Sequence, residues 1–129
     1  MTHKKILLVD DDSDDQFVFK DALTEIASGI ECIVANNGLE ALDLLEATVP
    51  PPSIFFVDLN MPFMNGFEFL EHVKNEKKFR EIPVIIFTTS DSPADKRRSL
   101  DSGAHLFLTK TSDFKLLKTS LQKILESEW

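Results

Sequence analysis

One short apolar segment limits what this chain can fold into. Residues 54–57 are Ile, Phe, Phe and Val, and they lead directly into the carboxylate of Asp58. An uninterrupted apolar run of this length, bounded by turn residues, predicts a strand that is buried on both faces. Open α/β sheets bind ligands at the carboxyl ends of their strands, so an acid at this position favours chemistry over packing.

Four further segments repeat the strand pattern and alternate with helical patterns. The predicted strands are residues 6–9, 31–35, 54–57, 83–88 and 105–109. The predicted helices are residues 13–28, 39–47, 67–77, 94–102 and a last one from about 112. Five β–α units with short connections predict an α/β fold, in which helices cover both faces of one parallel sheet. We expect a single domain over residues 1–129 with no separate output domain.

The first and fourth helical patterns differ in their apolar content. In the first, Val18, Ala22 and Ile26, flanked by Phe19 and Leu23, form an apolar stripe, and Ser13 is the expected N-cap. Phe17 falls off this stripe, which predicts either a side chain tucked under a loop or a docking contact.

The fourth helix is thinly apolar. Ala94 and Leu100 supply most of its apolar surface. Its basic run, residues 96–98, is either a solvated face or a contact for a partner. A helix with so little to bury suits a movable element.

Charge and cysteine content exclude several classes of function. The chain has 14 Lys and Arg against 22 Asp and Glu, a net charge of −8, which disfavours binding to nucleic acid or anionic membranes. Its one cysteine, Cys32, excludes an internal disulfide and lies in an apolar run, where a buried, inert thiol is expected. No segment is typical of a signal peptide or a membrane span, so we expect a cytoplasmic protein.

Polar residues follow four of the predicted strands. Asp10 and Asp11 follow the first, Asp58 the third, Thr88 ends the fourth and Lys110 follows the fifth. In a sheet ordered 2-1-3-4-5, the third strand is central and its neighbours lie at roughly 4.8 Å on each side. The fifth strand is then about 10 Å away, a gap that a lysine side chain can cross.

The acidic residues at this edge predict a metal site. Three crowded carboxylates repel one another unless a cation is present, and oxygen ligands suit Mg²⁺. We expect Asp11 and Asp58 as direct ligands, Asp10 acting mainly through water, and the backbone carbonyl of Asn60 completing the set. Asp58 would attack the phosphorus of a phosphohistidine in line, with Lys110 and the Thr88 hydroxyl contacting phosphoryl oxygens.

These motifs resemble one family. The residues that carry the likeness are Asp10-Asp11, Asp58-Leu59-Asn60-Met61-Pro62 with Gly66, Thr88-Thr89 and Lys110. They are similar to those of the receiver domain of two-component response regulators over nearly the whole chain. The resemblance implies a flavodoxin-like doubly wound fold of order 2-1-3-4-5 and phosphotransfer from a sensor histidine kinase or a histidine phosphotransfer protein.

The resemblance further implies a signalling protein that is not an enzyme beyond its own phosphorylation and dephosphorylation. Thr88 and the aromatic Phe107 would switch the face formed by the fourth helix, fifth strand and fifth helix. That face would then bind a downstream protein, dimerise or pass the phosphoryl group onward. Lys110-Thr111-Ser112 and the terminal Trp129 look similar to stand-alone receivers that work with phytochrome-like kinases.

Two residues depart from the family pattern. Most receivers have proline in a cis bond after the lysine, where this chain has Thr111. A non-proline cis bond costs about 3–4 kcal/mol, so the Lys110–Thr111 bond is either trans or strained. Phe107 stands where tyrosine is common, so its switch would depend on packing alone.

Other functions compete with this interpretation. A binding module of the same fold would work without phosphate, although all the site residues are present. A flavin carrier would want a hydroxyl- and Gly-rich loop after the first strand, where this chain has acids. A metal-dependent phosphatase would want its nucleophile at the end of the first strand.

The glycine of the family motif has a structural explanation. Gly66 is best explained by the backbone conformation at the start of the third helix.

Overall fold

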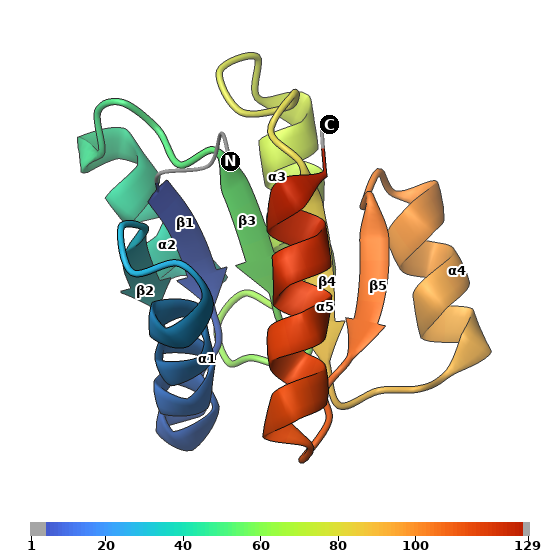
Figure 1. The fold of residues 1–129 in the computed structure, drawn as a ribbon. Helices are drawn as coiled ribbons and strands as arrows, with labels where there is room; N and C mark the ends of the chain where they lie inside the picture. The colour runs from blue at the N-terminus through green and yellow to red at the C-terminus, as the bar shows by residue number, and fades with distance from the viewer. Residues whose placement is uncertain (1–4, 128–129) are drawn as a thin grey trace.

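The computed structural model of the chain describes residues 5–127, so Trp129 lies outside the described residues. Five strands and five helices alternate along it (Figure 1). They are β1 (Lys5–Val9), α1 (Ser13–Ile26), β2 (Glu31–Ala35), α2 (Gly38–Ala47), β3 (Ile54–Val57), α3 (Gly66–Asn75), β4 (Val84–Thr88), α4 (Pro93–Asp101), β5 (Leu106–Thr109) and α5 (Phe114–Glu126). The strands are parallel and ordered β2-β1-β3-β4-β5. The predicted doubly wound α/β fold is confirmed.

Helices cover both faces of the sheet. α1 and α5 lie side by side on one face, α2 and α3 cover the other, and α4 lies next to the edge strand β5 (Figure 1). Alternate strand residues enter opposite cores: Ile54 and Phe56 pack with α1 and α5, whereas Phe55 and Val57 pack with α2 and α3. Every residue of β3 is buried, which explains its unbroken apolar sequence.

The start of α1 differs from the prediction. Asp12, and not Ser13, is the N-cap, and its carboxylate accepts a hydrogen bond from the N–H of Asp15 at 3.0 Å. Either residue type can cap a helix, so composition alone did not decide between adjacent candidates. The helix ends at Ile26, two residues before the predicted end.

The packed face of α1 is centred on Ala22 and on the residues predicted to flank the stripe, Phe19 and Leu23. Val18 was expected to be buried but is 40% exposed. The buried residues of the helix are Phe19, Ala22 and Leu23. Phe19 and Leu23 are four residues apart and therefore lie above one another on the face that meets the sheet. Phe17 is 71% exposed, so the alternative in which it tucks under a loop is wrong.

Smaller differences occur at other element ends. α3 ends at Asn75 and not near residue 77, and α5 begins at Phe114 with Asp113 as its N-cap. Phe67, expected to be buried on α3, is only half-buried, and Phe69 occupies the core instead. Helix ends commonly differ by one or two residues from sequence expectation.

α4 buries less apolar surface than its sequence suggested. Ala94 and Leu100, its expected apolar contacts, are both exposed, Leu100 to 39%. The one buried residue of the helix is Ser99, whose hydroxyl donates to the Asp95 carbonyl at 2.7 Å. Because that bond closes within the helix, Ser99 can be buried with its polar group satisfied.

Candidate functional site

The backbone hydrogen bonds of the sheet continue past the strand ends to two predicted site residues, Asp58 and Lys110. The N–H of Asp58 donates to the Val9 carbonyl at 2.9 Å, and the N–H of Lys110 donates to the Thr88 carbonyl at 2.6 Å. Asp58 is thereby fixed to the end of β1, and Lys110 to the end of β4. Most of the site is built from the carboxyl ends of central strands, which are rigid because they are paired on both sides.

Three carboxylates converge at this edge. Asp10, Asp11 and Asp58 each offer an oxygen, and these atoms all lie within 4.8 Å of one another. Asp10 and Asp58 are buried whereas Asp11 is exposed, so the cluster opens to solvent on one side. Oxygen donors with an open side suit Mg²⁺, which takes carboxylate ligands and keeps several waters. Between residues 5 and 127, no other group of three acidic, histidine or cysteine side chains converges in this way.

The ammonium of Lys110 lies against the same carboxylates. Its Nζ donates to Asp10 at 2.7 Å, to Asp15 at 2.8 Å and to Asp58 at 3.0 Å. The Lys110 side chain is 9% exposed, so these are largely desolvated, charge-assisted hydrogen bonds. The Lys110 side chain therefore extends from the end of β5 past β4 to Asp58, as the strand spacing predicted.

Burial and ion pairing act on the titration of this group. Burial alone would lower the pKa of Lys110, but its hydrogen bonds to Asp10 and Asp15 more than offset this and the pKa is raised above its ordinary value. Burial raises the pKa of Asp10, and the hydrogen bonds from Lys110 and from the Asp12 N–H oppose that rise. The ammonium therefore stays charged at any physiological pH, and a further cation near Asp10 would favour the charged form of that carboxyl group.

The remaining predicted residues, Thr88, Asn60 and Phe107, have different surroundings. Thr88 is fully buried, and its hydroxyl oxygen accepts a 3.4 Å hydrogen bond from the N–H of Ser90. Asn60 is exposed, two residues beyond Asp58. Phe107 is half-buried and packs against the core under α2 and α3. Thr88 thus ends the strand that pairs with β3, Asn60 faces solvent, and Phe107 belongs to the core on the α2 and α3 face of the sheet.

The reason that glycine is required at position 66 differs from the predicted one. Its backbone φ is not positive, so no special backbone conformation requires glycine there. A Cβ at this position would lie 2.2 Å from the Asp58 carbonyl oxygen, well inside van der Waals contact. The Gly66 N–H donates to the Leu59 carbonyl at 2.9 Å, which holds α3 against the loop after β3. Glycine is needed because two backbone segments approach closely.

The peptide bond after Lys110 has the ordinary trans form. Among residues 5–127 the one cis peptide bond joins Val49 and Pro50, so the Lys110–Thr111 bond is trans. Of the two possibilities that Thr111 left open, the strained one is wrong.

Asp15 is a site residue that the sequence analysis missed. It was not among the predicted site residues, yet its carboxylate forms an ion pair with Lys110 at 2.8 Å. The available signal was its spacing: with the helix capped at Asp12, Asp15 lies in the first turn. That turn directly follows the acidic pair at the end of β1, so its side chains can reach the same edge of the sheet.

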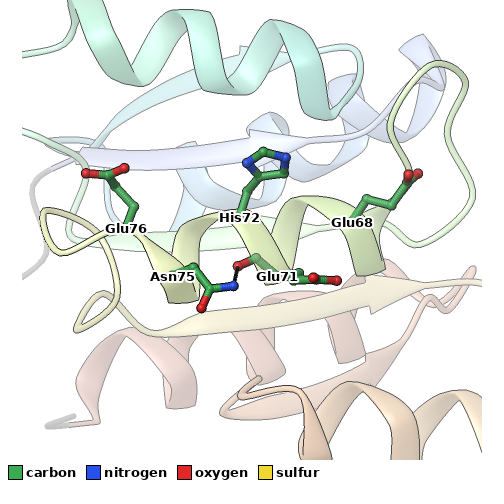
Figure 2. A pocket seen from close by; sticks show the side chains of 5 residues that line it. All are labelled: Glu68, Glu71, His72, Asn75 and Glu76. Atoms are coloured by element: carbon green, nitrogen blue, oxygen red, sulfur yellow. Dashed lines mark hydrogen bonds between the residues drawn. The ribbon is translucent and has the colours of Figure 1, made fainter.

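A surface hollow of about 450 Å³ along α3 is separate from this cluster. It is lined by Glu68, Glu71, His72, Asn75 and Glu76. Figure 2 shows that these side chains spread to different sides of the helix, with His72 on one side and Asn75 on the other. Asn75 donates its side-chain N–H to the carbonyl of Glu71 at 3.0 Å. Without convergent donors, the hollow does not offer the chemistry of the Asp58 cluster.

No helix between residues 5 and 127 has the length and apolar character that a membrane span requires.

Known proteins resemble the chain along almost its full length. Residues 6–122 match the family described as the response regulator receiver domain. The chemotaxis protein CheY homolog of Campylobacter jejuni is 33% identical over 121 residues, covering 94% of this chain and 92% of that protein. Response regulator Rcp1 of Synechocystis is 32% identical over 131 residues, covering 98% and 88%. Sensor histidine kinase CheAY of Helicobacter pylori is 31% identical over 123 residues, 95% of this chain but only 15% of that kinase.

Solved structures share the fold. The phosphorylated cyanobacterial phytochrome response regulator RcpA has a TM-score of 0.87 at 29% identity, covering 97% of this chain and 93% of that chain. The Mn(2+)-bound form of response regulator Rcp1 has a TM-score of 0.85 at 30% identity, covering 98% and 97%. The sheet order, the carboxylate cluster at its edge and the match over residues 6–122 together show that this chain belongs to the response regulator receiver domain family.

Proposed function

We propose that the protein is a phosphoacceptor response regulator in which Asp58 receives a phosphoryl group from a sensor histidine kinase or a histidine phosphotransfer protein. The observation that carries this proposal is the position of the Asp58 carboxylate, within 4.8 Å of two further acids and 3.0 Å from the Lys110 ammonium. Family membership favours this function over the flavin carrier and the phosphatase. We expect this phosphoryl transfer to take place in the cytoplasm, as proposed from the sequence.

Asp58 is held in one orientation for nucleophilic attack. One of its oxygens accepts a hydrogen bond from the Leu59 N–H at 2.7 Å, and the other accepts from Lys110 at 3.0 Å. A carboxylate oxygen forms a bond to phosphorus while the bond from phosphorus to the donor imidazole nitrogen breaks, and the electron pair stays on that nitrogen. Fixing the nucleophile in advance supplies part of the rate through orientation.

Mg²⁺ fits the carboxylate cluster. Asp11 and Asp58 would hold it directly, Asp10 mainly through water, and the Asn60 carbonyl would complete the protein ligands. When bound, the ion neutralises charge that develops on the transferring phosphoryl group. Two similar structures support a related chemistry, since one is of a phosphorylated regulator and the other is a Mn(2+)-bound form.

Lys110 and Thr88 would bind the phosphoryl oxygens. The Lys110 N–H that donates to Asp58 is already at the acceptor carboxylate. Within residues 5–127 the Thr88 hydroxyl accepts a long hydrogen bond from Ser90 and donates none, so its own proton would be available for a phosphoryl oxygen. Movement of Thr88 would let Phe107 repack and change the face formed by α4, β5 and α5, which would bind a protein partner or a second copy of the chain.

The phosphodonor would dock beside α1. Phe17 is 71% exposed on that helix, next to Gln16. The Gln16 side chain donates to the Asn36 side-chain oxygen at 2.9 Å and to the Asp10 carbonyl, which ties this part of α1 to the site. Phe63 is 82% exposed in the loop that follows Asp58. Exposed aromatic side chains on α1 and on the loop after Asp58 are typical of a protein-binding surface.

Phosphorylation by a small donor tests the proposal without knowledge of the kinase. The full chain is incubated with acetyl phosphate and Mg²⁺, and its intact mass is measured. We expect a gain of one phosphoryl group that is absent in Asp58→Asn and is prevented by a metal chelator. A mass unchanged in the wild type, or raised equally in Asp58→Asn, would contradict the proposal and favour a binding module that works without phosphate.

A further inference from the structure

Lys110 uses all of its hydrogen-bonding capacity on three carboxylates. An ammonium carries three N–H groups, and they are directed to Asp10 at 2.7 Å, Asp15 at 2.8 Å and Asp58 at 3.0 Å. Two of these acids belong to the cluster that suits a metal ion, whereas Asp15 does not. Asp15 is therefore the one partner of Lys110 that need not be shared with a cation.

Asp15 is itself fixed in space. It lies in the first turn of α1, and its backbone N–H donates to the capping carboxylate of Asp12 at 3.0 Å. Asp12 is connected in turn to the site, since its N–H donates to an Asp10 oxygen at 3.0 Å. A lysine side chain has many rotamers, and holding its end requires acceptors that do not move.

We propose that Asp15 is a positioning residue, which with Asp10 holds the Lys110 ammonium so that its third N–H is directed to the phosphoryl group on Asp58. This inference rests on the proposed function. When the acyl phosphate forms, the N–H that Asp58 now accepts passes to a phosphoryl oxygen, and the bonds to Asp10 and Asp15 stay in place. No proton is transferred, because the ammonium remains charged throughout.

A general effect of an acid at the start of α1 is the alternative explanation. Asp15 is 39% exposed, and acids in a first helical turn stabilise the helix through its dipole. Asp14 separates the two explanations because it lies in the same turn and is exposed. Asp14→Asn removes the same charge from the same turn, and within the described residues the three acceptors of Lys110 do not include Asp14.

The experiment compares Asp15→Asn with Asp14→Asn in the full chain. We expect Asp15→Asn to slow phosphorylation by acetyl phosphate and Mg²⁺ by roughly tenfold, since it weakens one hydrogen bond to a charged group. Asp14→Asn should stay within about twofold of the wild type, and Mg²⁺ affinity should change similarly in both variants, because neither residue belongs to the metal cluster. Equal phosphorylation rates in the two variants would overturn the proposal.

A second readout needs neither phosphate nor metal. The lysine ammonium protons are followed by NMR, and we expect the Lys110 signal to exchange with water several-fold faster in Asp15→Asn but not in Asp14→Asn. An unchanged Lys110 signal in Asp15→Asn overturns the positioning role, whatever the phosphorylation assay gives. A wild type that accepts no phosphoryl group while the ammonium signal responds as expected overturns the proposed function and the directing of Lys110 toward phosphate, but identifies Asp15 as the anchor of Lys110.

Discussion

The centre of the sheet and its β5 edge are built in different ways. Every residue of β3 and β4 is buried, and Asp58 follows β3 while Thr88 ends β4; only Lys110 among the predicted site residues follows β5. β5 has exposed residues at both ends, and α4 beside it buries one residue, Ser99. Rigid packing is therefore concentrated where the carboxylates converge, and loose packing where a partner could bind. A region with few buried contacts opens at low cost, so this difference suits a protein that reacts at one place and responds at another.

A matched pair of substitutions tests the difference directly. Ile85 and Leu106 are register partners on β4 and β5, but Ile85 is fully buried and Leu106 is 38% exposed. We expect Ile85→Ala to lower the free energy of unfolding by about 2–5 kcal/mol, because it leaves a cavity in the core. Leu106→Ala should lower it by less than about 1 kcal/mol. Urea denaturation measures both, and similar losses would contradict the comparison.

The opposite edge strand, β2, offers a chemical test of burial. Cys32 is half-buried on β2, less than the sequence predicted, and burial raises the pKa of its thiol to about 11. The thiolate is the reactive form, so near pH 8 we expect alkylation roughly 100-fold slower than in the unfolded chain. The rate should climb as the pH approaches 11, because ionisation is delayed in the folded state. Alkylation at the same rate with and without denaturant would contradict the burial of Cys32, and β2 would then be as accessible to solvent as β5.

Glycine substitutions compare the site with a distant loop. Gly66→Ala places a Cβ against the backbone of Asp58, so we expect a loss of about 1–3 kcal/mol in the free energy of unfolding together with weaker Mg²⁺ binding. Gly29 has nothing within 4 Å of an added Cβ, and Gly29→Ala should leave stability unchanged or slightly higher. Thermal unfolding and Mg²⁺ titration of both variants give the answer, and an unperturbed Gly66→Ala would show that the close approach is not needed.

The smallest expected effect lies at α4. The Arg98 guanidinium lies 3.9 Å from the centre of the Phe67 ring and so connects α4 to α3. A partly exposed cation–π contact contributes about 0.5–1 kcal/mol. Arg98→Ala should therefore speed amide exchange in α4 by roughly two- to fivefold. Arg97→Ala, a neighbouring exposed residue, is the control, and equal exchange in the two variants would remove the role assigned to Arg98.

The fold was predictable because its strongest signals are local. Unbroken apolar runs mark the central strands, and motif residues at their ends indicated which side chains meet. The reach of Lys110 to Asp58 followed from strand spacing. Asp15 was missed because its role depends on where the first turn of α1 points, which changes when the cap moves from Ser13 to Asp12.

Two other features could not be predicted from the sequence for similar reasons. The need for glycine at position 66 comes from two backbone segments that are distant until the chain folds. The buried face of α4 could not be predicted from apolar residues, because the helix turns Ser99 inward and leaves Leu100 exposed. The roles of Asp58, Thr88 and Phe107 in phosphorylation and switching stay predictions.

Hydrogen exchange with and without a phosphoryl mimic tests the central claim most directly, since it observes both regions of the molecule at once. The full chain is measured with Mg²⁺ alone and with Mg²⁺ and beryllofluoride. We predict slower exchange in the loops after β1 and β3, altered exchange in α4 and β5, little change in the β3 and β4 strands, and no response in Asp58→Ala. Exchange that is unaffected by beryllofluoride in the wild type, or altered equally in Asp58→Ala, would contradict the account.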